Sequence, residues 1–255
     1  KYLGIAALGI YSIGGMVYQY VVGVPNMLAI VLYARLQETF GERGSPEGIK
    51  NYLIFPILSA SFITAFLNGF FTLTIPLAVH WVLPKFISGI PTMKIFIWGA
   101  FFTAIGQQAN TFLVTLDKQW KTLPILILGV GVTYLFGFLC LRWVGGIEGV
   151  ALGVVIGSMI YNLVMIIYAK KHYSDWVEWL KFLGLVFSFL VYFLLLTFLV
   201  DQLGSETELG KVILKALIYS AAAIPAAWLL DKKTHIFTIA RLMIQEKLKS
   251  FRSQP

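Results

Sequence analysis

Ionisable side chains are scarce in this 255-residue sequence. Charged residues make up 13% of the chain, hydrophobic residues make up 58%, and the mean hydropathy is +0.81. A water-soluble protein needs polar side chains to cover its outside, so this composition excludes an ordinary soluble domain. The sequence instead predicts an all-α, multispanning bundle of transmembrane helices whose main solvent is lipid.

Side chains that could hold a metal ion or attack a substrate are also few. Cys140 stands alone, which excludes a disulfide framework within the chain. His80, His172 and His235 belong to different segments, and none has a second histidine or a carboxylate at metal-ligand spacing. We therefore expect no enzyme, no metal and no cofactor. The alternative, an integral membrane transferase with His80 or His172 as its base, would need a carboxylate partner that the sequence does not supply.

Apolar runs account for most of the chain. A helix of about 20 apolar residues crosses the hydrocarbon core, and seven runs reach that length, at residues 8–34, 51–83, 92–116, 122–142, 147–168, 181–201 and 211–230. The second run carries Pro56 and Pro76, so we expect a tilted or kinked helix there. Gly145, Gly149, Gly153 and Gly157 recur every four residues, which predicts a groove for close helix packing.

Basic residues predict the orientation of these spans. The formal net charge is +8, but the basic residues are scattered between apolar runs, so no nucleic-acid partner is expected. Fourteen lysines and arginines fall on one side of the seven spans, against six on the other, which places the first side and the C-terminus in the cytoplasm. All seven tryptophans lie near run ends, as expected at the headgroup level.

Two segments have the pattern of interfacial helices. Residues 174–181 place two tryptophans at i, i+3, and residues 234–255 form a basic tail with one apolar face. We expect the tail to lie on the inner leaflet against anionic lipids, with an ordinary solvated helix as the alternative.

Polar residues inside the spans are the candidates for a substrate cavity. Each costs free energy in hydrocarbon unless it meets a partner or a water-filled space. Tyr11 and Tyr18 share a face of the first span, and Thr103, Gln107 and Asn110 share a stripe of the third, which we expect to border an aqueous cavity. The candidates are Tyr11, Tyr18, Asn26, Asn68, Lys94, Gln107, Gln108 and Asn110. The alternatives are that the amides bond neighbouring helices and that Lys94 extends to the interface.

Acidic residues are missing from the middle of every span. Asp117, Glu148 and Asp201 all lie at or near span ends. Transporters driven by protons or cations usually need a buried carboxylate. A cavity of amides, tyrosines and a lysine would suit a sugar or a phosphate instead.

Four short motifs resemble polysaccharide and O-antigen flippases of the multidrug/oligosaccharidyl-lipid/polysaccharide exporter superfamily. The family's usual Gly-x-Tyr-Ser start and Pro-Arg-Leu-like inner end correspond to LGIYSI and LYARL here, with Ala34 where proline is common. LPKF, followed by Gly89 and Pro91, resembles the outer turn, and GIEGVALG opens the fifth span. The motifs lie at residues 8–13, 32–36, 83–86 and 146–153.

The resemblance implies two pseudo-symmetric lobes that flip a lipid-linked oligosaccharide across the cytoplasmic membrane by alternating access. Residues 1–173 would be the five helices of the C-terminal lobe, 174–233 two trailing helices and 234–255 the cytoplasmic tail. The implied partners are the lipid-linked glycan, membrane lipids and a preceding N-terminal lobe. The expected location is a bacterial or archaeal inner membrane. A multidrug or ion antiporter of the same superfamily is the alternative function.

Overall fold

Seven long α-helices make up the computed structural model, which describes residues 4–43, 50–170, 176–204 and 208–234. The helices are α1 (Gly4–Arg43), α2 (Lys50–Val82), α3 (Ile90–Thr115), α4 (Gln119–Trp143), α5 (Gly146–Lys170), α6 (Trp176–Asp201) and α7 (Leu209–Thr234). A short 3-10 helix, η2 (Pro84–Gly89), joins α2 to α3. All seven long helices are apolar enough to cross a membrane, so the prediction of an all-α multispanning bundle is confirmed.

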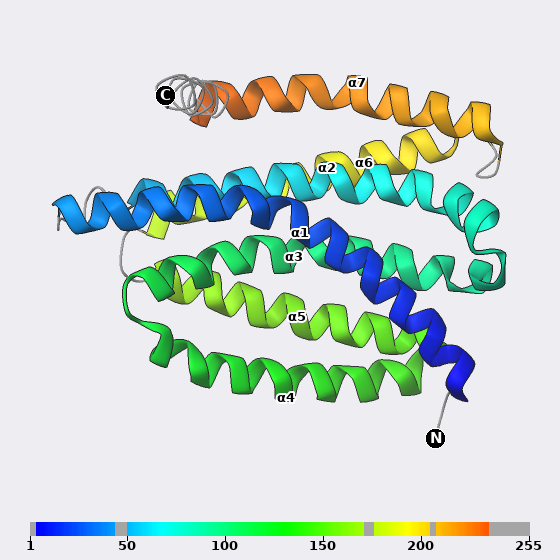
Figure 1. Ribbon diagram of the computed structural model, residues 1–255, viewed down its shortest axis with the longest axis horizontal. Helices are drawn as coiled ribbons and strands as arrows, with labels where there is room; N and C mark the ends of the chain where they lie inside the picture. The colour runs from blue at the N-terminus through cyan, green and yellow to red at the C-terminus, as the bar shows by residue number, and fades with distance from the viewer. Residues whose placement is uncertain (1–3, 44–49, 171–175, 205–207, 235–255) are drawn as a thin grey trace, which may run out of the picture.

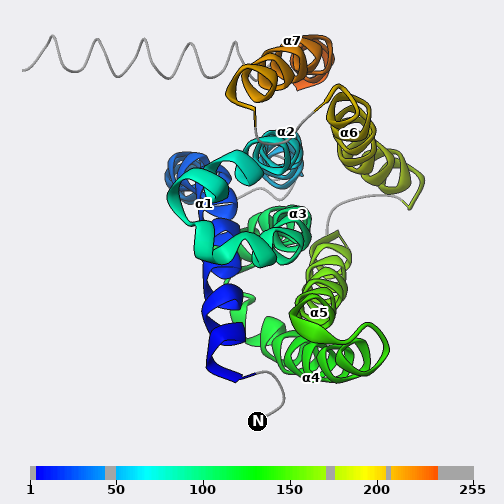
Figure 2. The same cartoon turned by 90° about the vertical axis from the view of Figure 1, so that its right-hand side faces the viewer.

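The helices run up and down side by side, and α3 lies at their centre (Figures 1 and 2). On one side α3 packs against α1 and α2, on the other against α5, and α4 packs against α5. Helices α6 and α7 pack on α2. One buried apolar cluster joins α2, α3, α5, α6 and α7, and a second joins α1, α2 and α3.

Turn residues explain where several helices end. Asp117 has a positive φ of 55°, and its N–H and that of Lys118 bond back to carbonyls of α3, a pattern that closes many helix C-termini. Gly145 and Gly146 have φ values of 74° and 62° at the α4–α5 turn. Gly145 therefore serves the turn, and only Gly149, Gly153 and Gly157 of the predicted series lie within α5.

Pro56 and Pro76 both lie inside the continuous helix α2, and the kink expected from them stays a prediction. Helix α1, which contains Pro25, changes direction along its length (Figure 1). Residues 176–181 begin the spanning helix α6 and do not form a separate interfacial segment. Trp179 there is buried and packs on Phe182 with ring centroids 4.9 Å apart, unlike exposed Trp176. Asp175 and the tail from residue 235 lie outside the described residues.

Candidate functional site

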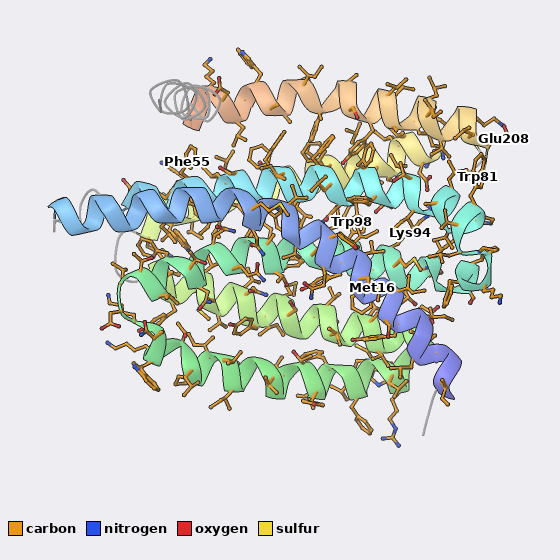
Figure 3. The ribbon with its side chains drawn as sticks, viewed as in Figure 1. Met16, Phe55, Trp81, Lys94, Trp98 and Glu208 are labelled. Atoms are coloured by element: carbon orange, nitrogen blue, oxygen red, sulfur yellow. The ribbon has the colours of Figure 1, made fainter. Side chains whose placement is uncertain are left out.

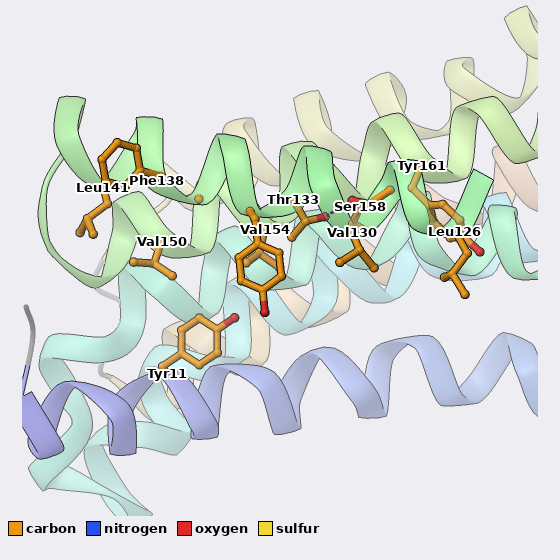
Figure 4. Close-up of a pocket in the computed structure, with 13 residues that line it drawn as sticks. Tyr11, Leu126, Val130, Thr133, Phe138, Leu141, Val150, Val154, Ser158 and Tyr161 are labelled. Atoms are coloured by element: carbon orange, nitrogen blue, oxygen red, sulfur yellow. Dashed lines mark hydrogen bonds between the residues drawn. The ribbon is translucent and has the colours of Figure 1, made fainter. Parts of the chain in front are cut away.

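A groove of about 750 Å³ lies between α1 and the α4–α5 hairpin (Figure 4). It extends from Phe138 and Leu141 at one end to Leu126 and Tyr161 at the other. Tyr11 approaches it from α1, opposite the wall that α4 and α5 form. The lining residues are Tyr11, Leu126, Gly129, Val130, Thr133, Tyr134, Gly137, Phe138, Leu141, Val150, Val154, Ser158 and Tyr161.

Close packing of α4 on α5 produces one wall of the groove. A Cβ atom at Gly153 would lie 2.4 Å from the Gly137 Cα atom, and one at Gly149 would lie 2.5 Å from the Cys140 carbonyl oxygen. Gly157 likewise meets Thr133. Glycine is thus required for the two backbones to approach so closely. The predicted packing role of these three α5 glycines is confirmed.

The groove is open to the outside of the described bundle along α4. Val130, Tyr134 and Phe138 follow one another at intervals of four residues, so they share a stripe of the helix. All three are exposed as well as lining the groove, and Tyr134 is 78% exposed. An apolar molecule in the bilayer could therefore enter the groove from the side.

Hydroxyl groups supply the polarity of the groove. They belong to Tyr11, Thr133, Tyr134, Ser158 and Tyr161, and no lining residue is an aspartate, glutamate, lysine, arginine or histidine. Thr133 bonds the Gly129 carbonyl of its own helix at 2.8 Å. The groove can thus offer hydrogen bonds to an uncharged polar group, within walls that are mostly apolar.

A polar cluster of Tyr18, Thr103, Ser158 and Asn162 adjoins the groove through Ser158. The Tyr18 hydroxyl donates to the Thr103 hydroxyl, whose oxygen lies 2.8 Å from the Ser158 hydroxyl oxygen. Asn162 Nδ2 donates to the Ser158 carbonyl at 2.7 Å and to its hydroxyl at 3.2 Å. The cluster therefore links α1, α3 and α5 by hydrogen bonds inside the apolar bundle.

Glycine on α3 makes room for this cluster. A Cβ atom at Gly106 would lie 2.0 Å from Asn162 Oδ1, and one at Gly99 would lie 2.4 Å from a methyl group of Val155. Thr103 lies between these glycines on the α3 stripe that faces α5. The absence of side chains at both positions lets Thr103 reach Ser158.

Two predicted site residues lie at or beside the groove. Tyr11 lines it, and Tyr18 is one end of the polar cluster. Both tyrosine rings pack edge-on against Phe96 of α3, with centroids 5.1 and 6.1 Å away. The shared face predicted for these two tyrosines thus packs on α3.

Three other predicted residues lie apart from the groove. Asn26 is half-buried and follows Pro25 in α1. Asn68 is fully buried in α2, and neither its Oδ1 nor its Nδ2 atom has a hydrogen-bond partner among the described residues. Lys94 is in the second turn of α3, toward the bundle end that holds Trp81 and Glu208 (Figure 3).

The remaining candidates, Gln107, Gln108 and Asn110, also lie on α3. Asn110 continues the stripe of Thr103 and Gly106. Gln107 has a buried Oε1 atom without a hydrogen-bond partner in the described structure. Gln108 is buried. Helix α3 contributes no residue to the groove. An aqueous cavity along α3 stays a prediction.

The residues that α4 and α5 contribute to the site are absent from the predicted candidates. Ser158 and Asn162 are polar residues four apart within an apolar run, which is the same signal that identified Asn68. No such signal marks Thr133, Tyr134 and Tyr161, because hydroxyl residues are common in membrane spans. Tyr161 is identified only by its contact with Gly129 in the structure.

Of the three histidines, only His80 lies within the described residues. His80 Nδ1 lies 2.7 Å from the Pro76 carbonyl oxygen one turn earlier in α2, so this nitrogen is bonded to its own helix. His172 and His235 are outside the described ranges. Within those ranges no three His, Cys, Asp or Glu residues are grouped to hold a metal ion.

Comparison with known proteins returned no match to any family model, curated protein or solved structure.

Proposed function

We propose that the chain is part of a transporter that flips a lipid-linked oligosaccharide across a cytoplasmic membrane by alternating access. The groove between α1 and the α4–α5 hairpin is the observation that supports this most strongly. It combines a side opening toward lipid with hydroxyl groups and apolar walls. A molecule with a long apolar chain and a sugar headgroup needs all three.

The chemistry of the lining favours such a substrate over a cationic drug or an ion. A cation in a low-dielectric site needs a carboxylate or several fixed oxygen ligands. None of the groove residues is acidic. Hydroxyl groups both donate and accept hydrogen bonds, which suits the many hydroxyls of a sugar.

The proposed orientation follows from the up-and-down arrangement. The C-terminal ends of α1, α3, α5 and α7 lie at the same end of the bundle, the first three of them before the α1–α2, α3–α4 and α5–α6 junctions (Figure 1). The larger set of basic residues is at these junctions and in the tail, so this end would face the cytoplasm. A preceding lobe would close the transport pathway, in a bacterial or archaeal inner membrane.

Reconstitution of the full-length protein tests the proposal. Vesicles would carry a fluorescent lipid-linked oligosaccharide in both leaflets, and a membrane-impermeant quencher would report its movement. We expect transport of this lipid and none of a cationic dye or of sodium. Transport of the dye or the ion alone would overturn the proposal in favour of an antiporter.

Variants of the full-length protein separate the candidate residues. Lys94→Ala and Gln108→Ala should slow flipping if these side chains border the pathway, and wild-type rates would remove them from it. His80→Ala is the matched control. A flippase should retain its activity in this variant, whereas a transferase with a His80 base would lose it.

A further inference from the structure

Helices α1 and α3 pack side by side and run in the same direction. A Cβ atom at Gly89, which caps the start of α3, would lie 2.5 Å from Ile10 Cγ2. Further along both helices, the Tyr18 hydroxyl donates a hydrogen bond to Thr103. Later residues of α1 therefore face later residues of α3, and these two contacts define the register.

The side of α3 that faces α1 continues past Thr103 to Gln107. Phe96 packs on the Tyr18 ring, and Ala100 belongs to the buried cluster that joins α1, α2 and α3. Gln107 follows Thr103 by four residues and Ala100 by seven, so the three share one stripe of the helix. Gln107 thus faces α1 one helical turn beyond Thr103.

Gln107 has a hydrogen-bond acceptor that is not used. Its Oε1 atom is buried and has no partner among the described residues. Buried polar groups in native proteins are nearly always hydrogen-bonded, so an unpaired one needs an explanation. A tyrosine hydroxyl is a suitable donor for an amide oxygen, and Tyr18 lies one turn away on the facing helix.

Thr103 would remain hydrogen-bonded without Tyr18. Its hydroxyl oxygen lies 2.8 Å from the Ser158 hydroxyl oxygen and 3.4 Å from Asn162 Nδ2. If the Tyr18 hydroxyl moved from Thr103 to Gln107, no buried group would lose its last partner, and the Gln107 oxygen would gain one. The two arrangements are therefore balanced in hydrogen bonds.

We propose that α1 has two positions on α3, one helical turn apart, in which Tyr18 bonds either Thr103, as in this structure, or Gln107. Such a shift is about 5.4 Å, and one-turn ratchets between packed elements are an established form of conformational change. Gly14 makes room for it. A Cβ atom there would lie 2.9 Å from the Phe96 ring, and one turn further this glycine would face the small side chain of Ala100.

The shift would reach the groove through Tyr11. Tyr11 lines the groove from α1, two turns before Tyr18 on the same helix (Figure 4). A one-turn movement of α1 would carry the Tyr11 side chain about 5.4 Å along the wall that α4 and α5 form. The acceptor of Tyr18 would thus set the position of the α1 wall. This inference holds whatever the groove binds, so it does not rest on the proposed function.

Cysteine pairs in the full-length protein report the two positions, in lipid nanodiscs and with all other cysteines replaced. Ile10→Cys with Gly89→Cys should form a disulfide in the position seen here, because these residues touch. Ile10→Cys with Met93→Cys, one turn further along α3, should form a disulfide in the shifted position. Ile10→Cys with Ile95→Cys gives the background rate, because Ile95 follows Met93 by two residues and points the opposite way.

Variants of the two acceptors should change the rate of the shifted pair in opposite directions. Gln107→Leu removes the second acceptor and should lower that rate about fivefold, the effect of one hydrogen bond. Thr103→Val removes the first acceptor and should raise it by a similar factor. Thr115→Val is the matched control on α3, because its hydroxyl bonds a carbonyl of its own helix. It should react as the wild type does.

A background rate for the shifted pair in both the wild type and Thr103→Val would overturn the proposal. So would a rate that Gln107→Leu leaves unchanged, because the shift would then not depend on this acceptor.

A double-variant cycle of Tyr18→Phe and Gln107→Leu in the Thr103→Val background gives a second test that needs no new cysteine. Thermal unfolding should show that the two losses are not additive, because each removes the same hydrogen bond. Additive losses would overturn the proposal. Neither measurement uses a substrate, so a failure of the proposed transport function would leave both results unchanged.

Discussion

Lys215 Nζ lies 2.8 Å from the Asp201 carbonyl oxygen and 3.0 Å from its carboxylate, although Lys215 sits in the second turn of a transmembrane helix. A third bond reaches the Gly204 carbonyl at 3.0 Å. The side chain is almost fully buried. It thus bonds the end of α6 and the following turn, which fixes the α6–α7 hairpin.

Lys215→Met should lower the free energy of unfolding by roughly 1–3 kcal/mol, because it removes three hydrogen bonds that a buried ammonium group donates to the end of α6 and the following turn. Lys211→Met is the matched control. Lys211 pairs with Glu208 at 2.9 Å on the exposed side of the same helix, so its loss should cost about 0–1 kcal/mol. Thermal unfolding of the full-length protein in detergent measures both, and equal losses would contradict the role of Lys215.

Gly106→Ala should lower stability by roughly 1–3 kcal/mol, because the new methyl group would collide with Asn162 Oδ1. Gly184→Ala, in α6, places a methyl group where no atom lies within 4 Å and should be neutral or stabilising by up to about 1 kcal/mol. Adding Asn162→Ala to Gly106→Ala should recover part of the loss. A double variant whose losses simply add would show that the two residues do not collide.

Gly153→Ala tests the contact between α4 and α5. Its methyl group would meet the backbone of Gly137 and Phe136, which cannot rotate away, so we expect a loss of roughly 1–3 kcal/mol. Gly137→Ala is the control on the facing helix, because its methyl group would meet nothing within 4 Å. Chemical unfolding of the two variants should differ clearly, and matching curves would argue against the close approach.

Asn68→Leu should raise the unfolding temperature. Both amide atoms of Asn68 are buried without partners among the described residues, and an unpaired buried polar group costs about 1–3 kcal/mol. Leucine has a similar size and removes that cost. Asn162→Leu is the contrast, because Asn162 is hydrogen-bonded and should lose stability. A lower unfolding temperature for Asn68→Leu would mean that the amide is bonded in the native protein.

The sequence predicted the spans well because hydrocarbon thickness sets their length and their apolar composition. It predicted the packing of Gly149, Gly153 and Gly157 because small residues four apart form one face of a helix. It did not predict the role of Gly145, since the series crosses from a turn into α5 and only φ distinguishes the two.

The groove was harder to predict. Its volume depends on the distance between α1 and α4, and no local sequence pattern indicates that distance. Lys215 lies within the predicted run 211–230, but no local pattern indicates that it bonds Asp201, 14 residues earlier in the chain. Trp179 shows the same limit, because its neighbour Trp176 shares its sequence signal and not its burial.

The three α5 glycines that meet the α4 backbone also limit which parts of the bundle can move. Two helices in backbone contact have no side chains between them to rearrange, so α4 and α5 should move together as one rigid unit. Helix α1 contacts α4 and α5 only lightly, and it packs instead on α2 and α3. If the groove changes width in the proposed transport cycle, α4 and α5 should therefore move as a pair relative to α1.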